Sequence, residues 1–147
     1  MLVIYAANGC EKIAAAIAEG AQAIEIKITT NPIEINSEKN VVCLSKKILG
    51  SETNPIGNYV NGKHVYIIGV GFSFEKMRAA SEALTKKGAT VNNTLCLKRS
   101  SQLPFGSEVS ETELVRAKAF GERIASSVTG VRNLQENEKK RIRNYTK

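Results

Sequence analysis

The chain has 147 residues, of which 42% are hydrophobic and 24% are charged, and its formal net charge is +7. This length fits one domain, and the composition excludes a disordered, collagen-like or disulfide-scaffold chain. The longest apolar runs, such as residues 65–70, are far shorter than the roughly 20 residues of a membrane-spanning helix, so no membrane association is expected. Residues 1–5 have neither a positively charged segment nor a cleavage pattern, which predicts a cytoplasmic protein without a signal peptide.

The first third of the chain alternates strand and helix patterns. Residues 2–5 are a short run of strand formers, which predicts a buried strand. Residues 10–22 place their apolar positions on one helical face and predict a helix. Residues 23–28 alternate apolar and charged side chains, as in a half-covered or edge strand. Residues 40–45, with an apolar run at 41–44, predict a second buried strand.

The middle of the chain continues this alternation after a broken stretch. Glycine and proline interrupt residues 46–63, which we expect to be mostly loop. Residues 64–69 give the strongest strand pattern in the chain. Residues 74–87 are amphipathic and predict a helix that ends at a glycine. Residues 89–97 predict the last strand.

The final helix is expected to begin after an irregular loop over residues 98–110. Ser110 and Glu113 have the spacing of a capping box, and the apolar face runs to residue 128. Residues 130–147 hold six basic and two acidic residues, a net +4 that leaves only +3 for the body. We expect a domain over residues 1–129, followed by a solvated helix or a frayed tail. No aromatic platform accompanies these charges, so no nucleic acid partner is expected.

The element order predicts an α/β protein with a parallel sheet. In such sheets, ligands bind beyond the carboxyl ends of the strands. Four segments meet at that edge, and the first of them, residues 6–11, leads into a helix N-terminus. Small residues there allow an anion such as phosphate to approach the backbone N–H groups. The Walker A and dinucleotide-binding glycine patterns are both absent.

The cysteine and histidine residues do not indicate a metal site or a catalytic site. There are three cysteines, without a C-x-x-C pair, and His64 is the single histidine, so a zinc site is not expected. Cys43 and Cys96 lie in apolar runs and are expected to be buried hydrophobic residues. Cys10 starts a predicted helix, where the dipole favours a thiolate, but no arginine follows at the spacing of a phosphatase loop.

Several stretches resemble flavodoxins. Residues 2–5, a small-residue turn and residues 11–14 look like the first strand and helix of that family. Residues 62–71 look like its fourth strand and the loop after it, and residues 88–91 with 111–125 look like its last strand and helix. The resemblance implies a flavodoxin-like, doubly wound parallel five-stranded sheet in the order 2-1-3-4-5.

Two connections depart from the family. Residues 29–39 and 46–63 are too short or too broken for full crossover helices, so the middle crossovers are expected to be shortened. A homodimer would cover the sheet faces that this leaves exposed.

The resemblance also implies FMN, bound for electron transfer to a redox partner protein or for a small flavin-dependent reduction. The implied phosphate-binding residues are Ala6, Ala7, Asn8, Gly9, Cys10 and Glu11. The implied neighbours of the ring are Ser45, Lys46, Gly71, Phe72, Ser73 and Phe74. Each of the two phenylalanines either stacks on the flavin or fills the core. Lys46-Lys47 and Lys98-Arg99 lie in the loops at this edge and either attract an anionic ligand or an acidic partner or are solvated surface charges.

Three features support a different reading. The family's phosphate loop is rich in serine and threonine, whereas residues 6–10 contain no hydroxyl group. Residues 45–54 contain no aromatic residue, and flavodoxins are typically acidic whereas this chain is basic. The alternative is therefore a flavodoxin-like module without flavin that serves as a protein-binding or assembly domain.

Overall fold

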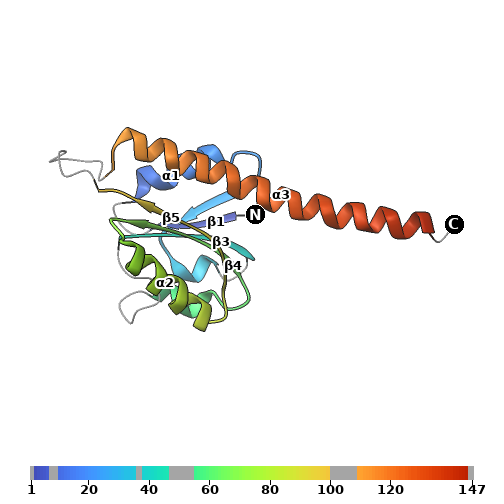
Figure 1. Cartoon of the computed structure of the whole chain (residues 1–147), viewed down its shortest axis with the longest axis horizontal. Coiled ribbons are helices and arrows are strands. Elements are labelled where there is room, and N and C mark those ends of the chain that lie inside the picture. Colours follow the sequence, from blue (N-terminus) through green and yellow to red (C-terminus); the bar gives the residue numbers. More distant parts are fainter. Residues whose placement is uncertain (1, 7–9, 36–37, 47–54, 100–108, 146–147) are drawn as a thin grey trace.

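The computed structural model describes residues 2–6, 10–35, 38–46, 55–99 and 109–145, with residues 129–145 described as backbone alone. Five strands form one parallel sheet: β1 (Leu2–Ala6), β2 (Ile26–Thr29), β3 (Asn40–Ser45), β4 (His64–Val70) and β5 (Thr90–Leu97). The helices are α1 (Glu11–Gly20), α2 (Phe74–Lys86) and α3 (Glu111–Tyr145), with two short 3₁₀ helices, η1 (Pro32–Ile35) and η2 (Pro55–Tyr59). The strand order is β2-β1-β3-β4-β5 (Figure 1), which confirms the predicted flavodoxin-like topology.

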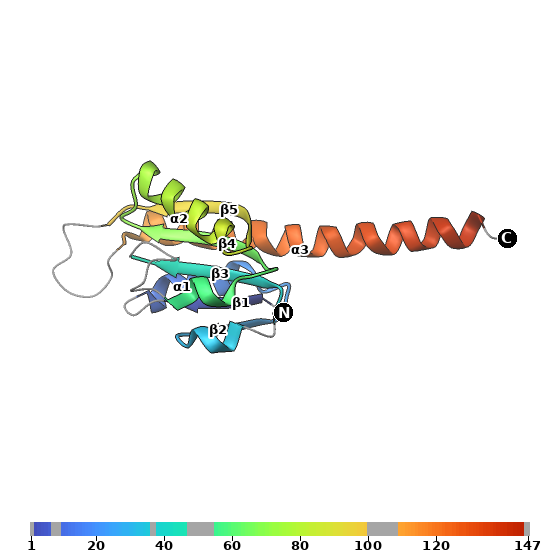
Figure 2. The same ribbon diagram turned by 90° about the horizontal axis from the view of Figure 1, so that it is seen from below.

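Helices cover the two faces of the sheet, as Figures 1 and 2 show. Successive strand residues point to opposite faces, so each central strand contributes to two cores. The core under α1 and α3 includes Leu2, Ile4, Val42, Leu44, Ile68, Ile17 and Phe120. The core under α2, η1 and η2 includes Val3, Val41, Val65, Ile67, Ile35, Ile56 and Met77. Burial of central strands on both faces explains their continuous apolar runs in the sequence.

The edge strand β5 is different in character. Its register against β4 shifts between Val65 and Tyr66, so that Val91 pairs with Val65 but Asn93 pairs with Tyr66. Asn92 is the extra residue of this bulge, and its side-chain amide donates to the Tyr66 hydroxyl at 3.4 Å. The strand is polar and largely exposed from Thr90 to Thr94.

The described residues of the two middle crossovers contain no full helix, in agreement with the sequence prediction. Within the described residues, the β2–β3 connection contains only η1, and the β3–β4 connection contains only η2. Lys63, just before β4, is buried, and its Nζ donates to the Ile35 carbonyl at 2.7 Å and to the Glu38 carbonyl. Burial lowers the pKa of this lysine, and the nearby Glu38 partly opposes that shift. The ammonium thus joins the end of η1 and the segment before β3 to the residue that precedes β4.

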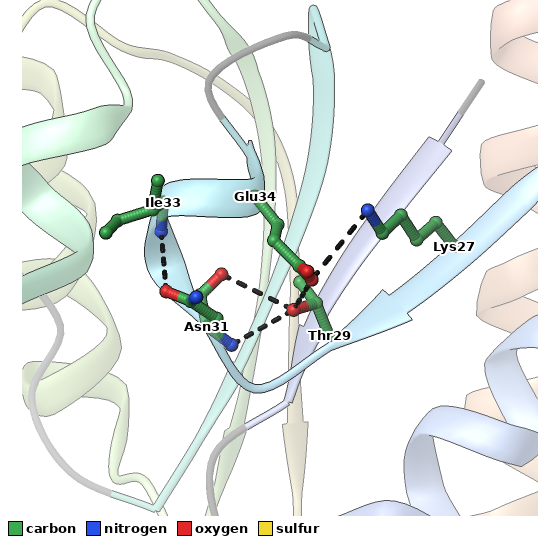
Figure 3. Close-up of polar contacts among 5 residues, drawn as sticks. All are labelled: Lys27, Thr29, Asn31, Ile33 and Glu34. Carbon is green, nitrogen blue, oxygen red and sulfur yellow. Dashed lines mark hydrogen bonds and ion pairs between the residues drawn. The ribbon is translucent and has the colours of Figure 1, made fainter.

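A polar cluster closes the turn between β2 and η1 (Figure 3). The Thr29 hydroxyl accepts from the Asn31 N–H at 3.0 Å and donates to the Glu34 carboxylate. The Asn31 side-chain oxygen accepts from the Ile33 N–H at 3.1 Å, as in an Asx turn. Lys27 lies 3.8 Å from the Glu34 carboxylate, and both side chains are about half exposed. These contacts fix the start of a connection that lacks a crossover helix.

Helices α1 and α3 cross at two glycines. A Cβ added to Gly20 would lie 1.9 Å from the Lys118 carbonyl oxygen, and one added to Gly121 would lie 2.2 Å from the Ile17 carbonyl oxygen. The two backbones are therefore in direct contact. An ion pair between Lys118 and Glu19, at 3.2 Å, lies beside the crossing.

The N-terminus of α3 has half of the predicted capping box. The Glu113 N–H donates to Ser110 Oγ at 3.4 Å. The Glu113 carboxylate instead accepts from the backbone N–H of Lys98 at 2.8 Å and pairs with Arg116 at 2.9 Å. This helix passes residue 129 without a break and continues to Tyr145, so the basic segment is helical up to that residue. No helix in the described part of the chain is long and apolar enough to span a bilayer.

Candidate functional site

The carboxyl ends of the strands bring most of the predicted site residues to one edge of the sheet. In the strand register, Ala6 pairs with Leu44 and Ser45 pairs with Gly69, so β1, β3 and β4 end side by side. Val70 pairs with Leu97, which adds the end of β5. The predicted residues Ala7, Asn8 and Gly9 lie outside the described residues, as do residues 47–54 and 100–106 of the neighbouring loops.

The turn between β1 and α1 is bounded by two buried residues. Ala6 is 1% exposed, and Cys10, the N-cap residue of α1, is fully buried. Glu11 is exposed in the first helical turn. The positive end of the helix dipole favours an anion here, but the Glu11 carboxylate already occupies that favourable field. A bound phosphate would share this helix end with one negative side chain.

The turn between β4 and α2 is tightly fixed. Gly71 has a φ of 74°, in the left-handed region that glycine adopts without strain. Its N–H donates to the Leu97 carbonyl at 2.8 Å, which ties the turn to the end of β5. The aliphatic part of Arg99 lies over Gly71, 3.2 Å from the place where a Cβ would be. Ser73 caps α2, since its Oγ accepts from the Lys76 N–H at 3.2 Å.

The two aromatic candidates of this turn differ in exposure. Phe72 is 8% exposed and belongs to the core that includes Tyr5 and Met77. Its ring occupies the space beside Gly69, where a Cβ would lie 2.3 Å from the ring. Phe74, at the start of α2, is 82% exposed. Phe74 is therefore the ring of this pair that a ligand can reach from the surface.

On the β3 side, Ser45 is 1% exposed, whereas Lys46 is half-buried. Lys98 and Arg99 are exposed after β5. The described part of the edge thus combines one exposed aromatic ring with three cationic side chains.

Glu113 and Arg116 also shape this edge, although the sequence did not single out that role. The Glu113 side chain is only 10% exposed, and its carboxylate receives two charge-assisted contacts from Arg116, at 2.9 and 3.1 Å. Its hydrogen bond to the Lys98 N–H holds the chain where β5 ends and the Lys98-Arg99 segment begins. The pattern Ser110-x-x-Glu113 predicted a local cap, and nothing in it pointed to a long-range contact.

The fold likeness extends to solved structures. The chain matches a two-electron reduced flavodoxin from Megasphaera elsdenii with 21% identity and a TM-score of 0.55, covering 81% of this chain and 98% of that one. A diflavin flavoprotein from Nostoc sp. matches with 15% identity and a TM-score of 0.58, covering 92% and 96%. A flavodoxin-like domain from Synechococcus sp. matches with 13% identity and a TM-score of 0.55, covering 87% and 97%. No known family and no curated protein matches the sequence. The fold is therefore flavodoxin-like, and these likenesses extend to the fold alone.

Proposed function

We propose that this protein binds FMN at the carboxyl edge of its sheet and acts as an electron carrier or a small flavin-dependent reductase. The observation that carries the proposal is the exposure of Phe74 at the carboxyl edge of the sheet, where ligands bind in open α/β sheets. The Phe74 ring is 82% exposed, and exposure of a large apolar ring to water is unfavourable. A planar ligand that stacks on the ring would remove this cost. Val115, another exposed apolar residue, belongs to α3, which packs on the opposite face of the sheet from α2.

The described residues at this edge have the chemistry that FMN binding requires. Phe74 offers a face for the ring, and Lys46 and Arg99 offer positive charge for an anionic ligand. The small side chain of Ala6 and the N-terminus of α1 leave backbone N–H groups as the phosphate ligands. When bound, the flavin would accept and donate the electrons, while these residues would bind and orient it. The cations also suit a redox partner protein with an acidic face.

A second function has its own support. The hydroxyl-free turn over residues 6–10 and the negative charge of Glu11 both weaken a phosphate site. Burial of Phe72 further leaves a single exposed ring in the β4–α2 turn. A flavodoxin-like module without flavin, serving protein binding or assembly, is consistent with these three features.

Titration of the purified chain with FMN separates the two functions. We expect flavin absorption in the purified protein, or saturable quenching of FMN fluorescence at micromolar concentration. Phe74→Ala should weaken binding by about fivefold, because stacking contributes on the order of 1 kcal/mol. Val115→Ala truncates another exposed apolar side chain, on α3 across the sheet from α2, and should leave binding unchanged. A colourless protein that does not alter FMN fluorescence would refute the flavin site and favour the flavin-free module.

A further inference from the structure

The sheet has two edge strands, and they differ in how open they are to a further strand. At one edge, β5 carries the bulge at Asn92 and is polar and largely exposed from Thr90 to Thr94. At the other edge (Figure 2), β2 pairs within the described residues with β1 alone, in a continuous register. A regular edge strand of this kind presents backbone N–H and C=O groups to which another strand can bind.

The hydrogen bonds to β1 show which residues of β2 face its open side. The Leu2 N–H donates to the Glu25 carbonyl at 2.8 Å, so residue 25 directs its backbone groups to β1. In a strand, every second residue directs them to the same side. Ile26 and Ile28 therefore direct their N–H and C=O groups away from the sheet, toward the open side.

An apolar side chain is exposed at the same edge. Ile26 and Ile28 pair with Leu2 and Ile4 of β1, which belong to the core under α1 and α3. Ile4 is fully buried, whereas Ile28 is 47% exposed. A strand added along β2 would cover Ile28 from its open side and remove apolar surface from water.

The charges on either side of Ile26 decide which strand fits. Glu25 precedes this residue and Lys27 follows it, and both side chains are exposed. The Lys27 ammonium lies 3.8 Å from the Glu34 carboxylate (Figure 3), and because an ammonium has three donor hydrogens it can also face a second carboxylate. A segment with an acid before its centre and a base after it is complementary to itself in the antiparallel direction.

Antiparallel pairing with a second copy can be centred on different residues of β2. Centred on Ile26, it places Glu25 of each copy directly opposite Lys27 of the other, and Ile28 opposite Ile24 on the other face. Centred on Lys27, it places two ammonium groups opposite each other, and centred on Ile28 it pairs each lysine with a neutral residue. Facing opposite charges stabilise a strand pair, whereas facing like charges destabilise it. The charges therefore favour the register centred on Ile26.

The same charges disfavour most other strands. A lysine on an edge strand commonly prevents extension of the sheet, because it faces an apolar or basic residue of the incoming strand. A strand with glutamate at the facing position escapes this penalty. The chain supplies that strand itself, since Glu25 and Lys27 lie two residues apart.

We propose that β2 pairs antiparallel with β2 of a second copy of this chain, centred on Ile26, so that the two five-stranded sheets join into one. The contact is symmetric, and residue 25 of each copy meets residue 27 of the other. The proposal does not rest on FMN binding, because none of the residues named for the phosphate or the ring lies in β2.

Sedimentation equilibrium of the full chain tests the pairing. We expect a reversible dimer over roughly 1–100 µM protein, the range in which small interfaces associate. Glu25→Lys places lysine opposite lysine, and Lys27→Glu places glutamate opposite glutamate. Each variant alone should therefore dimerise at least about tenfold more weakly, since both symmetric pairs change from attraction to repulsion.

Two combinations of these variants should restore the dimer. An equimolar mixture of Glu25→Lys and Lys27→Glu chains should form a heterodimer, because each lysine of one chain again faces a glutamate of the other. A single chain that carries both substitutions should form a homodimer for the same reason. Neither recovery is expected if a substitution acts only by damaging the fold.

Lys87→Glu is the matched control for Lys27→Glu. It makes the same change in net charge at an exposed position just after α2, which packs on β5 at the other edge of the sheet. This variant should dimerise like the unchanged chain. Circular dichroism of every variant checks that it is folded, and FMN titration of the unchanged chain tests the flavin site separately.

Three results would overturn the proposal. A chain that stays monomeric over the whole concentration range would leave this edge to a strand of another protein. A dimer that neither single substitution weakens would assign the contact to another surface. Folded, monomeric single variants that do not recover the dimer when mixed would show that Glu25 and Lys27 do not face each other.

Discussion

Replacement of Gly121 with alanine tests whether the backbone contact between α1 and α3 holds one face of the sheet together. The added Cβ would lie 2.2 Å from the Ile17 carbonyl oxygen, a separation that real Cβ contacts do not reach. Neither atom belongs to a flexible side chain, so the two helices must move apart. On the order of 1 Å of separation is needed to reach ordinary contact distances.

Two opposing effects set the magnitude. Alanine is favoured over glycine in the interior of a helix by about 1 kcal/mol. Overpacking a close contact costs roughly 1–3 kcal/mol, and a clash between backbones lies at the upper end of that range. We therefore expect Gly121→Ala to lower the free energy of unfolding by about 2 kcal/mol, a large part of the stability of a typical domain.

Urea unfolding followed by circular dichroism measures this change. Ala15→Gly on the exposed face of α1 is the control, because it reports helix propensity without a crossing contact. The combination of Gly20→Ala with Gly121→Ala should cost less than the sum of the two, since helices displaced for one methyl group leave room for the other. If Gly121→Ala instead stabilises the protein, as propensity alone requires, the crossing is not close-packed.

Two further predictions concern buried polar groups. Burial raises the pKa of the Cys43 thiol from 9.0 to about 12. The unfolded chain therefore loses this proton first, and stability present below pH 9 is lost as the pH rises toward 12. Between about pH 8 and pH 10 the loss should be about 1.4 kcal/mol in urea titrations, and Cys43→Ala should remove this part of the pH dependence. Glu113→Ala should lower the free energy of unfolding by about 2 kcal/mol, because it leaves the Lys98 N–H without its charged acceptor. Glu113→Gln keeps an acceptor for that N–H and should cost less, so equal losses in the two variants would show that the hydrogen bond to Lys98 contributes little.

The central strands were predictable because a strand that is buried on both faces has an uninterrupted run of hydrophobic residues. Residues 41–44 and 65–68 are unbroken runs of hydrophobic residues, and β3 and β4 contain them with little change from the predicted bounds of 40–45 and 64–69. The edge strand β2 was placed too early: it begins at Ile26, because the alternation that starts at Ala23 runs through the turn before it. An edge strand that is covered on part of its surface makes fewer contacts than a central strand. The hydrophobic pattern therefore predicts its first and last residues less accurately.

Long-range contacts were the part that the sequence could not supply. Nothing in the helix pattern of residues 10–22 indicated that the absent side chain of Gly20 makes room for the Lys118 carbonyl of another helix. Glu113 matched a local capping pattern, yet its carboxylate contacts the end of β5. Both roles depend on how distant elements pack, which local spacing does not encode.

The candidate site was predictable in position more than in detail. Topology alone places Ala6, Ser45 and the residues after β4 at one edge, because parallel strands end there together. The sequence left Phe72 and Phe74 equivalent, and only the packing around Gly69 distinguishes the buried ring from the exposed one.

The bulge in β5 also bears on how the protein behaves when crowded. A long, flat strand at the edge of a sheet is a template on which another chain can extend the sheet into aggregates. Here the Asn92 bulge twists the edge, and polar residues from Thr90 to Thr94 cover it. Fibre growth through β5 is thereby disfavoured, which matters for a small protein that offers neighbouring chains an exposed sheet edge.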